Sequence, residues 1–144
     1  MTKPIYILNG PNLNRLGTRE PAVYGTTTLA DIEAQCRAEA GVTPVEFRQS
    51  NSEAQLIDWV HEAIDRAAAI VINPAAFSFT SMALMDALKM FDGPIIEVHI
   101  TNIHAREPFR QRSYVSKAAR AMICGFGIEG YALAITGLAT MAGE

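Results

Sequence analysis

Glu97 and His99 are the residues whose types and spacing most directly suggest chemistry. They are two positions apart, and the short apolar segment Ile95–Val98 places them at its end. Side chains i and i+2 of a β-strand point to one side, so the carboxylate can hold the imidazole and fix its tautomer. A general acid or base is commonly oriented in this way. The alternative is a core histidine whose hydrogen bonding a buried glutamate satisfies.

Three arginines follow the histidine closely. Arg106, Arg110 and Arg112 lie within seven positions of a chain whose net charge is -3. A guanidinium binds a carboxylate through two parallel hydrogen bonds, so arginines beside an oriented histidine predict a small anionic substrate. A solvated basic loop is the alternative interpretation. The negative net charge argues against a nucleic-acid partner, because such proteins carry a basic excess.

Another polar group comes directly after the first apolar segment, in residues 10–25. It contains Asn12, Arg19 and Tyr24, which supply hydrogen-bonding groups, a cation and a titratable phenol. The glycines in this stretch suit a segment that closes over a ligand as a lid. We therefore expect a mobile loop that carries part of an active site.

The elements that must position these residues are short apolar segments alternating with segments of helical period. Strands that alternate with helices predict a parallel sheet covered on both faces. Five strands predict an α/β, flavodoxin-like three-layer sandwich with a five-stranded parallel sheet in the order 2-1-3-4-5. We expect residues 1–144 to form one catalytic domain of this type. The strands are expected at Ile5–Leu8, Val45–Phe47, Ala69–Ile72, Ile95–Val98 and Ala121–Cys124.

This fold would bring the polar groups together. Ligands of such sheets bind beyond the carboxyl ends of the strands. The loops after the first, third and fourth expected strands all emerge at that edge. The sequence therefore predicts one site shared by three loops.

Motifs for cofactors and metals are incomplete. Gly125–Gly130 reads GFGIEG, but no second strand and no ribose-binding acid about 20 residues further on follow it. We interpret its glycines as allowing close packing of a strand and a helix. The histidines, including His61 and His104, lack metal-ligand spacing with carboxylates, so we expect no metal and no cofactor. No segment approaches the roughly 20 apolar residues of a membrane span, which favours a cytoplasmic protein without a membrane partner.

Four segments together resemble type II 3-dehydroquinase, also called 3-dehydroquinate dehydratase. They read LNGPNLNRLGTREPAVYG, SNSEAQLIDWVHEA, INPAAFSFTS and IEVHITNIHAREPFRQRSYVS, and the similarity extends from Ile5 to about Ile135. The resemblance implies a trans elimination of water from 3-dehydroquinate that gives 3-dehydroshikimate through an enolate. The family needs neither a metal nor an organic cofactor. The reaction belongs to the shikimate pathway of aromatic amino-acid biosynthesis or to quinate catabolism.

The resemblance also implies roles for individual residues. Tyr24 would be the base that removes a proton from C2, and His99 the acid that protonates the leaving hydroxyl. The further catalytic residues would be Arg19, the essential loop arginine, and Asn12, which stabilises the enolate. The substrate-binding residues would be Asn73, Ile100 and Thr101 at the carboxylate, Arg110 at ring hydroxyls, Arg106 beside the tyrosine, and Asp86 from a neighbouring subunit.

The chain departs from the family pattern at three positions. Phe79 stands where the family usually has a histidine that meets a substrate hydroxyl, Ala75 where it has a glycine, and Met85 where arginine is common. One neutral hydrogen bond contributes roughly 0.5–1.5 kcal/mol, so Phe79 predicts an altered affinity for substrate. The residues with assigned chemical roles are all kept.

Two other functions stay open at this point. One is a paralogue that acts on a related cyclohexane carboxylate, because an altered contact can change specificity. The other is a non-catalytic, nucleotide-binding module, which the fold would permit. Assembly is implied by resemblance alone, since family members form trimers that pack into dodecamers.

Overall fold

The computed structural model describes residues 2–18 and 21–142, and it describes only the backbone of Val23, Tyr24 and Ala142. Five parallel strands form its central sheet, in the order β2-β1-β3-β4-β5. This confirms the predicted α/β class and strand order. The strands are β1 (Ile5–Asn9), β2 (Val45–Gln49), β3 (Ala69–Asn73), β4 (Ile95–His99) and β5 (Ala121–Cys124).

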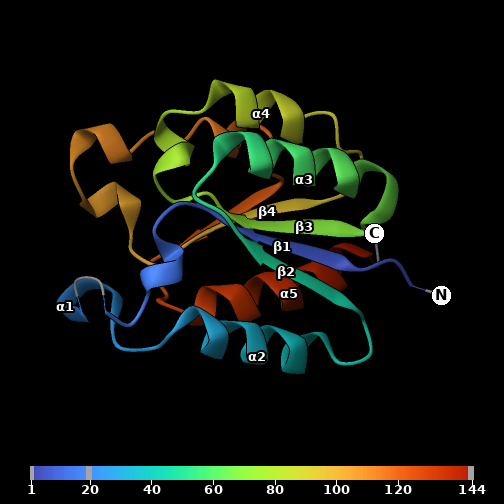
Figure 1. Cartoon of the computed structure of the whole chain (residues 1–144), viewed down its shortest axis with the longest axis horizontal. Coiled ribbons are helices and arrows are strands. Elements are labelled where there is room, and N and C mark those ends of the chain that lie inside the picture. Colours follow the sequence, from blue (N-terminus) through green and yellow to red (C-terminus); the bar gives the residue numbers. More distant parts are fainter. Residues whose placement is uncertain (1, 19–20, 143–144) are drawn as a thin grey trace.

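Helices cover both faces of the sheet (Figure 1). The helices α2 (Leu29–Ala40) and α5 (Glu129–Ala142) pack on one face, and α3 (Glu53–Arg66) and α4 (Met82–Leu88) pack on the other. A four-residue helix, α1 (Pro21–Tyr24), follows β1 and is not predicted by the periodicity. None of the helices among the described residues is long and apolar enough to cross a membrane.

The alternation of strand side chains divides the core into two halves. Ile5 and Ile7 of β1 face α2 and α5, whereas Tyr6 and Leu8 face α3 and α4. All four side chains are buried. Because both faces of the sheet are covered, the inner strands β1 and β3 read as continuous apolar runs up to their last residue, without an alternating pattern.

Four strands extend beyond their apolar segments, and β2 continues two residues past Phe47 to Gln49. Asn9, Asn73 and His99 are the last residues of β1, β3 and β4, although the hydrophobic runs end one residue earlier. Backbone pairing with neighbouring strands continues past the apolar side chains, as the register of Asn9 with Asn73 shows. Polar side chains are thereby fixed at the carboxyl edge of a rigid sheet.

Gly10 allows the loops after β1 and β3 to touch. Its N–H donates to the carbonyl oxygen of Asn73 at 2.8 Å. A Cβ atom at this position would lie 2.3 Å from the carbonyl oxygen of Pro74, which leaves no room for a side chain. Glycine is therefore required where these two backbones meet.

Of the glycines in residues 125–130, Gly130 serves the predicted close packing of strand and helix. A Cβ at Gly130 would lie 3.2 Å from Val98 and 3.5 Å from Ile123, so its absence lets α5 approach the sheet closely. Gly125 and Gly127 have positive φ angles of 93° and 61° in the turn that precedes α5.

Candidate active site

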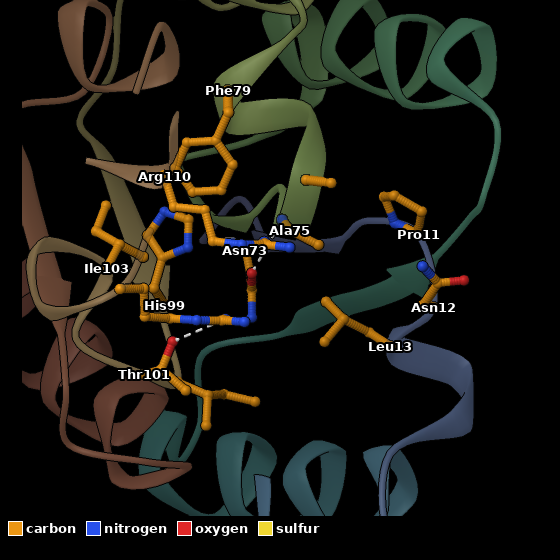
Figure 2. Close-up of a pocket in the computed structure, with 13 residues that line it drawn as sticks. Pro11, Asn12, Leu13, Asn73, Ala75, Phe79, His99, Thr101, Ile103 and Arg110 are labelled. Atoms are coloured by element: carbon orange, nitrogen blue, oxygen red, sulfur yellow. Dashed lines mark hydrogen bonds between the residues drawn. The ribbon is translucent and has the colours of Figure 1, made fainter. Parts of the chain in front are cut away.

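A pocket opens at the carboxyl edge of the sheet, where the three polar loops were expected to meet. Its volume is about 130 Å³. Pro11–Leu13 form one side of it, and Phe79, His99 and Arg110 lie together on another side (Figure 2). The pocket thus combines residues from the loops after β1, β3 and β4.

Glu97 and His99 form the contact that their spacing predicts. Oε2 of the carboxylate lies 2.5 Å from Nε2 of the imidazole. Glu97 is completely buried and His99 is 5% exposed, while His99 lines the pocket. A carboxylate that accepts from one ring nitrogen fixes the tautomer and leaves Nδ1 for exchange with a ligand.

Three serine hydroxyls surround the same carboxylate. Ser78 and Ser113 donate to Oε2 at 3.1 Å and 2.7 Å, and Ser116 donates to Oε1. Burial by itself raises the pKa of Glu97, but the hydrogen bonds from His99, Ser116 and Ser113 outweigh it and hold the pKa below its usual value. Glu97 is therefore an ionised, acceptor-only partner for the imidazole.

These serines were not predicted as site residues. Ser78 lies in the loop after β3, and Ser113 and Ser116 lie in the loop after β4, at least 35 positions further on. Neither loop has a periodic pattern. The signal that could have found them is the buried carboxylate itself, because a charge without water requires several donors.

Phe79 stacks on His99, and Arg110 lies over Phe79. The Phe79 and His99 rings stack with their centroids 5.8 Å apart and their planes 26° from parallel. The guanidinium carbon of Arg110 lies 5.8 Å from the Phe79 centroid. A phenyl ring at this position attracts the cation through its face but offers no hydrogen bond to a ligand.

Two guanidiniums line the pocket. Arg106 donates to Oγ1 of Thr101 at 3.3 Å (Figure 2) and pairs with Glu107 at 3.4 Å. Arg110 pairs with the other oxygen of Glu107 at 3.3 Å. Arg106 and Arg110 both contact Glu107 and both line the pocket, which places two guanidiniums where an anionic ligand could bind.

Two asparagines line the pocket: Asn12 in the loop after β1, and Asn73 at the end of β3. Asn12 adopts a left-handed conformation with a φ of 72°, and its N–H donates to Oδ1 of Asn51 at 2.9 Å. Asn73 is buried, and its Oδ1 accepts from the N–H of Ala75 at 3.1 Å. Ile100 and Thr101 complete this wall.

Of the expected site residues, Asp86 lies away from the pocket, and two others fall outside what the structure describes. Asp86 is exposed on α4 and does not line the pocket. Arg19 lies outside the described residues. Tyr24 ends α1, and its side chain likewise lies outside what the structure describes. The roles assigned to these residues stay predictions.

The remaining titratable groups do not form a metal site in residues 2–18 and 21–142, where no three histidine, cysteine or acidic side chains gather. His61 and His104 are exposed, away from the pocket lining. Arg112 is also exposed and does not line the pocket, unlike Arg106 and Arg110.

Comparisons with known proteins agree on one family. The model of dehydroquinase class II matches residues 3–139. A 3-dehydroquinate dehydratase of Acidovorax sp. (strain JS42) is 56% identical over 147 residues, which cover 96% of this chain and 99% of the relative. Another, of Chelativorans sp. (strain BNC1), is 58% identical over 142 residues, with coverage of 96% and 98%. The crystal structure of type II dehydroquinase from Propionibacterium acnes superposes with a TM-score of 0.92 at 49% identity, covering 97% of this chain and 98% of that one.

Proposed function

The chain belongs to the dehydroquinase class II family, and on this premise we propose that it is a 3-dehydroquinate dehydratase. Such an enzyme is a hydro-lyase, which removes water from a small-molecule substrate. The product is 3-dehydroshikimate. The comparisons favour neither a paralogue for a related cyclohexane carboxylate nor a non-catalytic nucleotide-binding module.

The observation that supports this activity best is the Glu97–His99 pair in a cationic pocket. An imidazole held by a buried carboxylate suits proton transfer to a leaving hydroxyl. Arg106 and Arg110 line the same pocket, so an anionic ring can bind beside the imidazole. The general acid and the residues that would bind an anion therefore line the same pocket.

The reaction divides into two proton transfers. Tyr24 removes the proton from C2, next to the C3 ketone, and the electrons of that bond form the enolate. The enolate then expels the C1 hydroxyl, which takes a proton from His99 and leaves as water. Nδ1 is the nitrogen for this transfer, because Glu97 holds Nε2.

Charged and polar side chains stabilise this sequence of states. Arg19 and Arg106 favour the phenolate form of Tyr24, because an opposite charge nearby favours the ionised form. Asn12 stabilises the enolate where its negative charge develops. Asn73, Ile100 and Thr101 bind the carboxylate, and Arg110 binds ring hydroxyls.

We also propose that the chain forms trimers that assemble into a dodecamer in the cytoplasm. Asp86 is exposed on α4 with the apolar side chains Met82 and Met90 close by in sequence, which are 55% and 58% exposed. Asp86 would complete a neighbour's pocket. Light scattering gives the mass, and an Asp86→Ala trimer should turn over more slowly than wild type; an active monomer would contradict this assembly.

The activity is tested by incubating the protein with 3-dehydroquinate and following the ultraviolet absorbance of the conjugated enone product. We expect a rise that depends on enzyme concentration and is lost in His99→Ala, which keeps the pocket but removes the acid. His61→Ala is the matched control, because His61 is exposed on α3. No rise with wild-type protein, under conditions where a known class II enzyme works, would contradict the proposed function.

A further inference from the structure

A chain of hydrogen bonds links the pocket wall to the interior of the protein. Nδ2 of the Asn73 side chain donates to the hydroxyl of Tyr131 at 2.9 Å, and that hydroxyl donates to Oδ1 of Asn9 at 2.7 Å. Nδ2 of Asn9 then donates to the backbone carbonyl of Arg48 at 3.0 Å. At the other end, Oδ1 of Asn73 accepts from the N–H of Ala75 at 3.1 Å.

The three side chains that form this series of hydrogen bonds are buried away from water. Asn9 and Tyr131 are completely buried, and Asn73 is 3% exposed. Burial raises the pKa of Tyr131, so its hydroxyl keeps the proton that it donates. A buried amide or hydroxyl without a partner is costly, and each member therefore depends on the next.

Backbone groups fix the direction of every hydrogen bond in the chain. The carbonyl of Arg48 can only accept, so Asn9 must turn its NH₂ group there and its oxygen toward Tyr131. The hydroxyl of Tyr131 donates to that oxygen and must therefore accept from Asn73. The N–H of Ala75 can only donate, so the oxygen of Asn73 faces Ala75.

One orientation of the Asn73 amide results. An asparagine amide is nearly symmetric in shape, and only its hydrogen-bond partners decide which end faces a ligand. With its oxygen and one N–H engaged, Asn73 has its second N–H left for the pocket that it lines. A carboxylate can only accept hydrogen bonds, so this orientation attracts it, whereas the flipped amide would repel it.

We propose that Tyr131 is a positioning residue that holds Asn73 as a donor to the substrate carboxylate. This role deepens the proposed function and rests on it. Tyr131 does not line the pocket, so its effect on substrate passes through Asn73. The substrate class that it selects is a ring acid with an ionised carboxyl group.

The test compares Tyr131→Phe with Tyr6→Phe. Tyr6 is a matched control, because it is also buried and donates a hydroxyl hydrogen bond, to Glu62 at 2.5 Å on the opposite face of the sheet. We expect Tyr131→Phe to raise KM for 3-dehydroquinate roughly three- to tenfold, the range for one lost hydrogen bond, with kcat within about twofold of wild type. Tyr6→Phe should change neither constant.

A second readout does not depend on activity. The side-chain amide protons of Asn73, assigned by nuclear magnetic resonance, should exchange slowly with water in wild type and in Tyr6→Phe, and faster in Tyr131→Phe. Unchanged exchange and unchanged KM in Tyr131→Phe would overturn the proposal. An equal rise of KM in both variants would do so too, because it would indicate general destabilisation.

Should Tyr131→Phe fail to fold, Asn9→Ala provides the same test. It removes the acceptor that orients the Tyr131 hydroxyl and should raise KM in the same direction; an unchanged KM would overturn the proposal. If wild-type protein failed to dehydrate 3-dehydroquinate, the proposed function would fall. The amide exchange would then still decide whether Tyr131 holds Asn73.

Discussion

Oε2 of Glu97 lies 2.5 Å from Nε2 of His99, at the end of a buried strand. Three serine hydroxyls hold the same carboxylate, so neither member of the pair can turn freely. The imidazole is thus oriented before a ligand arrives. Preorganised groups of this kind need little rearrangement during the reaction.

Glu97→Gln should lower kcat about 10²-fold, near the low end of the contribution of acid–base catalysis. The amide keeps the shape of the side chain but removes the charge that stabilises a protonated imidazole. KM should change little, because Glu97 does not line the pocket. Initial rates measure both constants, and Glu53→Gln, an exposed carboxylate on α3, is the control. A wild-type kcat in Glu97→Gln would contradict the role of the pair.

The same carboxylate should make the fold sensitive to acid. The folded state holds the pKa of Glu97 below the usual 4.5, so its contribution to stability is complete above pH 4.5 and is lost as pH falls through the lowered pKa. Urea unfolding at neutral pH and at several values below 4.5 measures this loss. Glu97→Gln should show a smaller loss of unfolding free energy over that range; an identical loss would contradict the prediction.

Ala75→Gly should stabilise the protein. Ala75 has a φ of 52°, a left-handed conformation that costs roughly 1–2 kcal/mol for a residue with a Cβ. Glycine removes this cost, but it also makes the unfolded chain freer, which lowers stability by about 0.4–1 kcal/mol. We expect the free energy of unfolding to rise by up to about 1 kcal/mol in urea titrations. Ala76→Gly, at a neighbour without a positive φ, should lower it, and equal effects would contradict this account.

Phe79→His should strengthen substrate binding. The phenyl ring stacks on His99 and offers no hydrogen bond to a ligand, whereas an imidazole could bond a ring hydroxyl. KM should fall by up to about tenfold, the equivalent of one neutral hydrogen bond. Phe79→Leu keeps an apolar side chain and should not lower KM. A higher KM in Phe79→His would show that this chain depends on the stacked phenyl ring.

Tyr24→Phe should abolish turnover while leaving the fold and ligand binding largely intact. The variant removes only the hydroxyl that is assigned to take the C2 proton. The enone assay measures turnover, and calorimetry with 3-dehydroquinate measures binding. Tyr114→Phe, at a side chain that is 38% exposed, is the control. Retained turnover would remove Tyr24 from its assigned role.

Local patterns predicted the sheet well because β1, β3 and β4 are fully buried and largely apolar. Ala121–Cys124 was predicted with the bounds that the structure has. A capping box of Thr28 and Asp31, a local signal of a helix start, begins α2. The ends of β1, β3 and β4 were each predicted one residue short, and the end of β2 was predicted two residues short. Hydrophobicity ends at the last apolar residue, whereas backbone pairing continues to Asn9, Asn73 and His99.

The site was predicted where its residues are neighbours in sequence. The Glu97–His99 contact follows from the two-residue period of a strand. Tyr131 and Asn9 lie 122 positions apart, and no local period relates them. A tyrosine on a buried helix face counts as apolar in such patterns, so the partner of its hydroxyl becomes visible only in three dimensions.

The close approach at Gly10 divides the pocket into a stiff side and an adaptable one. The N–H of Gly10 donates directly to the carbonyl of Asn73, and the absence of a Cβ at Gly10 lets the two backbones pack together. Neither backbone can therefore move aside for a larger ligand. Phe79 and Arg110 on the facing side are side chains that can be exchanged one at a time. A bulkier inhibitor or engineered substrate should therefore fit only after Phe79 or Arg110 is replaced by a smaller residue. The polar end of that ligand would stay next to Asn73.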